Sequence, residues 1–189
     1  MVTATRSKVA SGKASAPTKK VRTYDSALRY LYTQTDYEQM LRVRYNSDTF
    51  SLDRMRLLLK SLGNPQDKIK TVHIAGTKGK GSTATMLAEM LRACKYKVGL
   101  FTSPHICDIR ERIRVDGELI PRTHFMRLVA SAQPKISKMV DKPTFFEIMT
   151  AMAFVYYAEQ KVDIAVIECG LGGRLDSTNV IMPKVVGIT

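Results

Sequence analysis

The sequence predicts an α/β fold in which a mostly parallel sheet is covered by helices on both faces. Short apolar runs alternate along the chain with longer segments of helical periodicity, and strands alternating with helices form buried parallel sheets. In addition, an apolar run at residues 71–75 leads directly into a glycine-rich turn and a helix, as in a P-loop. The length of 189 residues suits one domain with appendages, which we place at residues 24–189.

The N-terminal half of this predicted domain begins with helices. Mixed spacings of three and four between apolar residues predict a helix over residues 25–44, followed by a polar loop at residues 45–51. A second helix is predicted over residues 52–62, with Ser51 as its N-cap and a terminating Gly-Asn-Pro at residues 63–65.

The pattern then changes to strands and helices in alternation. Strands are predicted at residues 71–75, 97–101, 163–168 and 184–189, and helices at residues 81–94, 123–139 and 145–160. Two short strands at residues 113–115 and 119–120 flank Asp116-Gly117, which is a strong hairpin signal.

The formal charge of +13 is concentrated near the N-terminus. Six positive charges precede the first acidic residue: Arg6, Lys8, Lys13, Lys19, Lys20 and Arg22. Residues 1–23 are typical of a disordered basic tail; a transit peptide is the less favoured alternative, because Lys outnumbers Arg and no amphipathic helix is evident. The remaining positive excess suits anionic substrates. We expect no nucleic-acid partner, because aromatic and basic residues do not interleave and no zinc finger or recognition helix is evident.

The three cysteines, Cys94, Cys107 and Cys169, are odd in number and lack CxxC spacing. This predicts a reducing compartment without a disulfide framework, and each cysteine is expected to be a small buried hydrophobe. No apolar run reaches the roughly 18 residues that span a bilayer. We therefore expect a cytoplasmic monomer without a membrane partner, with organelle targeting as the second choice.

The turn at residues 76–82 is the strongest functional signal. Its backbone N–H groups and the following helix N-terminus would attract phosphate, Lys80 adds a cation, and the Ser82 hydroxyl can reach a metal. The anionic ligand that fits this turn best is the phosphate tail of ATP. The common P-loop pattern would place Gly at 74 and Ser or Thr at 81, where this chain has Ile74 and Gly81. The structural alternative is a solvated glycine turn.

Three polar residues follow other predicted strands. Ser103 is a metal ligand or part of a simple turn, and it would lie beside the phosphate loop if the strands at 71–75 and 97–101 were neighbours. His105 is a ligand or satisfies its own loop. Glu168 follows four apolar residues and fits a Walker-B-like acid for Mg²⁺, the alternative being an acid at the edge of a solvated loop.

Two other patterns have sufficient structural explanations. The charges at residues 110–114 alternate as on a solvated or edge-protecting strand face, and residues 144–147 form a helix capping box. After Glu168, three glycines permit close backbone approach, and Arg174 and Asp176 pair with each other or contact a ligand.

Together these segments resemble the folylpolyglutamate synthase and dihydrofolate synthase family, within the Mur-ligase-like ATP-dependent amide ligases. The resemblance runs from about residue 25 to the end, and the combination of segments is specific although each alone is not. The matching segments are residues 52–55, 62–66, 73–82, 102–105, 110–113, 168–176 and 178–179.

The resemblance implies a reaction, and ATP and Mg²⁺ as cofactors. ATP would phosphorylate a carboxylate of a pteroate or folate, and L-glutamate would attack the acyl phosphate to give an amide, ADP and phosphate. The protein would mainly position the reactants and neutralise charge.

The resemblance also implies roles for individual residues. Lys80 and Glu168 would be catalytic, and Ser103 and Glu168 would bind Mg²⁺. The ATP-binding residues would be Gly76, Thr77, Lys78, Gly79, Lys80, Gly81 and Ser82. The substrate-binding residues would be Thr49, Phe50, Ser51, Thr144, Phe145, Phe146, Glu147, Leu175, Asp176 and Ser177.

The chain departs from the family pattern at several points. Lys78 stands where the family usually has Asn, and Cys169 where it often has Val. The family's metal-binding His, carboxylated Lys and C-terminal domain would lie beyond Thr189, so we expect a truncated N-terminal ATPase domain that cannot complete the ligase cycle alone. The alternatives are a non-catalytic nucleotide-binding module or another P-loop NTPase, which would need an ordinary Gly-Lys-Ser/Thr sequence.

Overall fold

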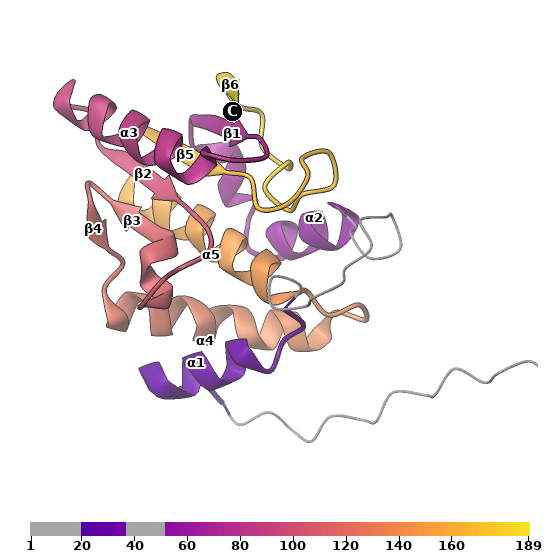
Figure 1. Ribbon diagram of the computed structural model, residues 1–189. Helices are drawn as coiled ribbons and strands as arrows, with labels where there is room; N and C mark the ends of the chain where they lie inside the picture. The colour runs from indigo at the N-terminus through magenta and orange to yellow at the C-terminus, as the bar shows by residue number, and fades with distance from the viewer. Residues whose placement is uncertain (1–19, 37–51) are drawn as a thin grey trace, which may run out of the picture.

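The computed structural model describes residues 20–36 and 52–189. Within these residues the chain forms a six-stranded sheet in the order β4-β3-β2-β5-β1-β6 (Figure 1). The parallel strands are β1 (Thr71–Ala75), β2 (Val98–Phe101), β5 (Ile164–Glu168) and β6 (Val185–Ile188). The antiparallel edge consists of β3 (Ile113–Val115) and β4 (Glu118–Leu119). The predicted α/β fold with a mostly parallel sheet is confirmed.

Helices cover both faces of the sheet (Figure 1). Helix α3 (Lys80–Ala93) buries Ala84 and Ala88 against Val72, Ile74 and Val166 on one face. On the other face lies α5 (Phe145–Gln160), which contacts α4 (Arg122–Lys138), α2 (Leu52–Ser61) and α1 (Tyr24–Tyr32). Successive strand residues point to opposite faces, so β2 and β5 contribute apolar residues to both clusters, whereas β1 contributes Val72 and Ile74 to the cluster under α3.

Most predicted elements lie within two residues of the observed ones, a difference typical of helix and strand ends. Helix α2 ends at Ser61, and the chain then turns at Gly63 and Asn64, whose φ angles are 85° and 48°. The hairpin turns at Asp116 and Gly117, also with positive φ. The Thr144 capping box is formed at the start of α5.

The predicted helix at residues 25–44 is wrong in its length. Helix α1 ends at Tyr32, because the Thr33 hydroxyl and the Gln34 amide both donate to the Tyr30 carbonyl and cap the last turn. The rest of that predicted helix from residue 37, the polar loop and the Ser51 cap lie outside the described residues. At the other end, Val21 is buried and its N–H donates to Gln133 Oε1 at 3.0 Å, although the sequence analysis placed it in the tail.

The charged segment at residues 110–114 does not form a solvated strand face. Ile109–Arg112 is a 3₁₀ helix, η3, and the Arg112 side chain is only 2% exposed. The Arg112 Nε donates to His105 Nδ1 at 2.8 Å, and its guanidinium carbon lies 5.2 Å from the centre of the Phe145 ring. The alternating charges predicted a strand face wrongly, because side chains in a 3₁₀ turn repeat with a different period from those in a strand. The structural alternative for His105, a residue that satisfies its own loop, is confirmed.

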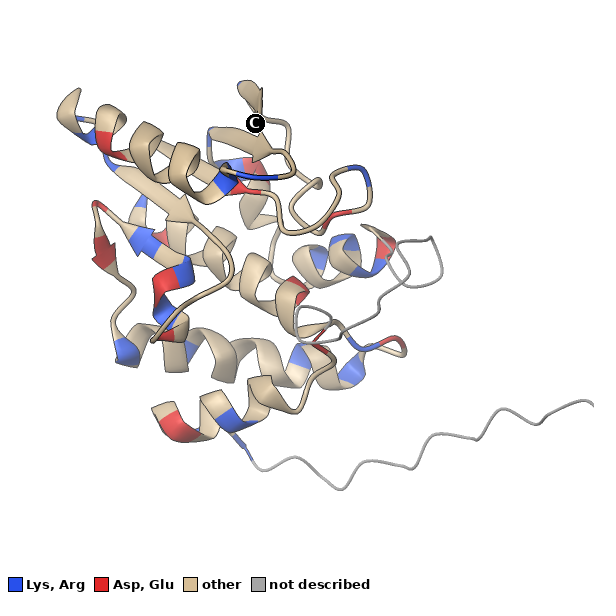
Figure 2. Cartoon of the chain, viewed as in Figure 1, with Lys and Arg blue, Asp and Glu red and all other residues tan. Residues whose placement is uncertain are grey.

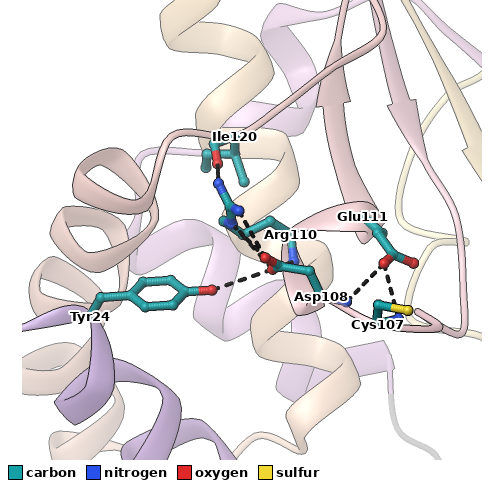
Figure 3. A network of polar contacts seen from close by, with 6 residues as sticks. All are labelled: Tyr24, Cys107, Asp108, Arg110, Glu111 and Ile120. Atoms are coloured by element: carbon teal, nitrogen blue, oxygen red, sulfur yellow. Dashed lines mark hydrogen bonds and ion pairs between the residues drawn. The ribbon is translucent and has the colours of Figure 1, made fainter.

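A polar network holds η3 and the segment after β2 (Figure 3). Asp108 accepts from Arg110 Nη2 at 2.8 Å and from the Tyr24 hydroxyl of α1 at 3.4 Å. Glu111 accepts from the N–H groups of Cys107 and Asp108 at 3.0 and 2.8 Å. The hydrogen bonds from Arg110 hold the pKa of the Asp108 carboxyl below its usual value. This network anchors the loop that leads from Ser103 into η3.

The cysteines divide by environment. Cys169 is buried as predicted, and burial raises its pKa to about 12. Cys94 and Cys107 are exposed, so the prediction of buried hydrophobes is wrong for them. All three cysteines are free thiols in the structure.

Charges of both signs mix on the described surface. Residues of both charges occur on each of α1, α2 and η3 (Figure 2). In the described part of the chain, every helix is too short or too polar to cross a bilayer.

Candidate active site

The carboxyl ends of three parallel strands bring the predicted site residues to one edge of the sheet. The sequence left open that β1 and β2 are neighbours. They are not, because β5 lies between them. The last residue of β5, Glu168, thereby lies between the loop after β1 and the loop after β2. The Ser103 N–H donates to Glu168 Oε2 at 2.9 Å and fixes this carboxylate. Such an edge is where parallel α/β sheets bind ligands.

The loop after β1 has the conformation that its glycines permit. Gly76 and Gly79 have φ angles of 144° and 79°, which residues with a side chain rarely adopt. Helix α3 begins at Lys80, and its first turn contains no acidic residue that would itself reduce the positive end of the helix dipole. The Lys80 Nζ donates to the Gly76 carbonyl at 3.1 Å and thus lies over the loop. The loop therefore presents an ammonium group and a helix N-terminus to an anion.

The extra glycine in this loop has a physical reason. A Cβ on Gly81 would lie 3.3 Å from both carboxylate oxygens of Glu168, closer than most side-chain contacts. Glu168 is only 4% exposed, which rules out the alternative of an acid at the edge of a solvated loop. Glycine at position 81 lets this buried carboxylate approach the first turn of α3. The departure from the common P-loop pattern thus accommodates Glu168.

The donor set at this edge fits Mg²⁺ held mainly by phosphate. Mg²⁺ in nucleotide sites usually takes one or two protein carboxylates, phosphate oxygens and water. Glu168 supplies the carboxylate, and hydroxyls are carried by Ser82 in the first turn of α3 and by Ser103 in the loop after β2. Within residues 20–36 and 52–189 there is no cluster of three His, Cys, Asp or Glu side chains that could hold a metal by itself.

The start of α5 is built by a cap and an ion pair. The Thr144 hydroxyl accepts from the Glu147 N–H at 3.2 Å, and Glu147 Oε2 accepts from the Thr144 N–H at 2.7 Å. The Arg54 Nε of α2 donates to both oxygens of Glu147, at 2.8 and 3.0 Å. Glu147 is 2% exposed, so its carboxylate is engaged inside the protein. These contacts give Thr144 and Glu147 a complete structural explanation.

The two phenylalanines that follow have different surroundings. Phe145 is buried, with its ring centre 6.0 Å from that of Tyr32 in a stacked arrangement. Phe146 is half-buried, and its ring centre lies 5.8 Å from that of Phe101. A Cβ on Gly170 would come within 2.6 Å of the Phe146 ring. Phe146 therefore packs directly against the loop that follows Glu168.

That loop is held by Asp176, which is 3% exposed. Asp176 accepts from the N–H groups of Leu171 and Thr178, at 2.8 and 3.0 Å, and from the Thr178 hydroxyl. The Arg174 side chain is exposed, and its carbonyl accepts from the Asn179 amide at 3.0 Å. Asp176 thus organises its own loop.

Sequence reasoning missed His73, which lies in the middle of β1. It is 5% exposed, and its Nε2 lies 2.8 Å from Thr178 Oγ1. Burial lowers the pKa of this imidazole, partly opposed by the negative charge of Asp176. The signal in the sequence was a histidine inside an otherwise apolar strand.

The structure brings most of the predicted residues to the same end of the sheet. Residues 76–82, Ser103 and Glu168 meet there, and the loop after Glu168 joins them through Phe146. Thr49, Phe50 and Ser51 lie outside the described residues. Buried Phe145, Glu147 and Asp176 support this end from inside the protein.

Comparisons with known proteins identify relatives of this chain. No family model matches the chain. The dihydrofolate synthase/folylpolyglutamate synthase of Bacillus subtilis is 47% identical over 143 residues, which are 73% of this chain and 33% of that protein. The chain therefore spans about a third of the length of this curated relative.

Solved structures give the same result. The folylpolyglutamate synthase of Thermotoga maritima is 43% identical with a TM-score of 0.75, over 85% of this chain and 36% of that chain. A folylpolyglutamate synthase in complex with AMPPCP and folate is 36% identical with a TM-score of 0.79, over 88% of this chain and 40% of that chain. By sequence and by fold, the chain belongs to the folylpolyglutamate synthase and dihydrofolate synthase family and corresponds to the N-terminal part of these proteins.

Proposed function

We propose that this chain supplies the ATP site and part of the folate site of a ligase that joins L-glutamate to a pteroate or folate carboxylate. The observation that carries the proposal is the approach of Glu168 to Gly81, which places a buried carboxylate beside the glycine loop and Lys80. The complex of a related synthase with AMPPCP and folate supports both ligand classes.

Each group at the edge has a role in phosphoryl transfer to the substrate carboxylate. The N–H groups of residues 76–82 and the Lys80 ammonium would hold and neutralise the β- and γ-phosphates. Glu168 and Ser103 would hold Mg²⁺, which supplies further charge neutralisation when bound. An acyl phosphate formed there would be attacked by the amino group of L-glutamate.

The pteridine-containing substrate would contact the loop after Glu168 and the start of α5. We propose direct contacts for Phe146, Leu175 and Ser177, because each of these side chains is only half-buried. Four further residues would support these contacts without touching the substrate, because they are buried and engaged in internal contacts: Thr144, Phe145, Glu147 and Asp176. We also propose that Thr49, Phe50 and Ser51 contribute to substrate binding. The protein would be a cytoplasmic monomer without nucleic-acid or membrane partners.

The test is binding of each ligand class to the 189-residue chain. Calorimetry with a non-hydrolysable ATP analogue, with and without Mg²⁺, is expected to show binding that Mg²⁺ strengthens. Parallel titrations with dihydropteroate and tetrahydrofolate would identify the acceptor, and ADP release with L-glutamate would establish turnover. Binding of the analogue without either pteridine would leave a non-catalytic nucleotide-binding module. Binding of no ligand would refute the proposal.

The Gly81→Ala variant is expected to bind Mg²⁺ and ATP about tenfold more weakly, because its methyl group would displace the Glu168 carboxylate. The unfolding free energy should change by less than about 2 kcal/mol, because the helix preference of alanine over glycine, up to about 1 kcal/mol, offsets part of the cost of moving the carboxylate. Calorimetry and urea unfolding measure the two effects. Thr85→Ala, at an exposed position of the same helix, is the matched control. Parent-like affinity in Gly81→Ala would show that the position of Glu168 is unimportant.

Deleting residues 1–19 is expected to leave ATP binding within about twofold, while salt-sensitive binding to a DNA oligonucleotide falls, because four basic residues are removed. The deletion stops before Val21, since this residue is buried against the domain. Filter binding at two salt concentrations makes the measurement. A loss of ATP affinity on deletion would place the N-terminus in the nucleotide site.

A further inference from the structure

A buried polar chain connects β1 with the loop after β5. His73 lies in β1 upstream of the phosphate loop, and its Nε2 is 2.8 Å from Thr178 Oγ1. Thr178 is fully buried, and its hydroxyl also contacts Asp176 Oδ1. These contacts link positions that are 105 residues apart in the sequence.

The direction of each hydrogen bond follows from the groups involved. One oxygen of Asp176 accepts from the Leu171 N–H and the other from the Thr178 N–H, as in an ionised carboxylate, which only accepts. The single hydroxyl proton of Thr178 is therefore donated to Asp176. The Thr178 oxygen must then accept from His73, so His73 carries its proton on Nε2.

The hydrogen bonds among His73, Thr178 and Asp176 hold the loop at both of its ends. The Leu171 and Thr178 N–H groups bind the same Asp176 carboxylate, so residues 171–178 close on themselves. A Cβ on Gly170 would lie 3.1 Å from Asp176 Oδ2 and 2.6 Å from the Phe146 ring, so the start of the loop packs closely against both side chains. His73 then fixes the closed loop to the strand that carries the phosphate loop.

A histidine is well suited to this position. Its neighbours in the sheet are Ile167 of β5 and Val186 of β6, so the surroundings are largely apolar. An aliphatic residue would pack there but would leave the Thr178 oxygen without its donor, and a buried polar group without a partner is costly. Burial keeps the imidazole in its neutral form, which provides a directional donor without an unpaired charge.

We propose that His73 is a positioning residue that, through Thr178 and Asp176, holds residues 171–178 in the conformation that binds the pteridine-containing substrate. The part of this inference that concerns substrate rests on the proposed function. The part that concerns the loop depends only on the contacts within the chain.

The experiment compares Thr178→Val, which removes the hydroxyl at similar size, with Thr178→Ser, which keeps it. The first readout is limited trypsin digestion at Arg174, an exposed residue and the only Lys or Arg between Lys161 and Lys184. Cleavage requires local opening of the loop, and loss of these hydrogen bonds is expected to speed it about tenfold in Thr178→Val. Thr178→Ser should stay within about twofold of the parent.

The second readout separates positioning from general damage. Calorimetry of both variants is expected to give about tenfold weaker binding of the preferred pteridine substrate to Thr178→Val, with affinity for the ATP analogue within about twofold. Equal cleavage rates and equal substrate affinities in both variants would overturn the proposal. Equal losses of ATP and substrate affinity would overturn it as well, because they indicate a merely structural role.

The outcomes for the two proposals are distinguishable. Faster cleavage of Thr178→Val supports the role of the Thr178 hydroxyl, which links Asp176 to His73, in holding the loop even if the parent chain binds neither ligand, a result that would overturn only the proposed function. A third measurement needs no variant. Long-range nitrogen–proton NMR spectra of the parent should show the proton of His73 on Nε2, and a proton on Nδ1 alone would overturn the assignment.

Discussion

The Arg54→Met variant is expected to lose about 3 kcal/mol of unfolding free energy, because it leaves the Glu147 carboxylate buried without its positive partner. The Arg54 and Glu147 side chains are only 11% and 3% exposed, so water replaces little of the lost interaction. The expected loss lies at the low end for a broken buried pair, because Glu147 keeps its hydrogen bond from the Thr144 N–H. Urea unfolding followed by circular dichroism measures the change.

The same helix offers a matched control. Arg56 pairs with Asp53 at 3.3 Å, but these side chains are 60% and 86% exposed. The Arg56→Met variant should therefore change the unfolding free energy by less than about 1 kcal/mol. Adding Glu147→Gln to Arg54→Met should recover part of the loss, because glutamine keeps the capping box without a charge. Equal effects of Arg54→Met and Arg56→Met would contradict the importance of the buried pair.

The Lys80→Ala variant is expected to bind the ATP analogue about ten- to a hundredfold more weakly, because a charge-assisted contact to phosphate contributes about 1.5–3 kcal/mol. Lys80 Nζ donates to the Gly76 carbonyl and lies over the loop where phosphate would bind. The fold should be little affected, since this contact closes only a local turn. Calorimetry in Mg²⁺ gives the affinity, and thermal unfolding checks the fold.

Lys78→Asn is the control for Lys80→Ala. Lys78 lies in the same loop, but its side chain is exposed. Removing its charge should weaken binding only a few-fold, through screened electrostatics. If Lys78→Asn and Lys80→Ala lose affinity equally, the loop attracts phosphate by net charge alone, and the specific role of Lys80 is wrong.

The sequence by itself determined the features that depend on neighbouring residues. Hydrophobic periodicity located β1, α3 and α5 to within a residue or two. The Thr144 capping box could be recognised in the sequence because its two partners lie three positions apart. The order of strand, glycine loop, lysine and helix predicted a phosphate site in the same way. Glu168 was recognisable as a strand-end acid, because four apolar residues precede it.

Only the tertiary structure decided the features that depend on distant residues. The insertion of β5 between β1 and β2, the burial of Arg112 against Phe145 and the bond between His73 and Thr178 all join segments far apart in the chain. Strand order and burial are set by how helices pack on the sheet, and no local pattern encodes this packing. The charge alternation at residues 110–114 and the single histidine in β1 therefore had no unique local interpretation. Their roles arise from the partners that folding brings to them.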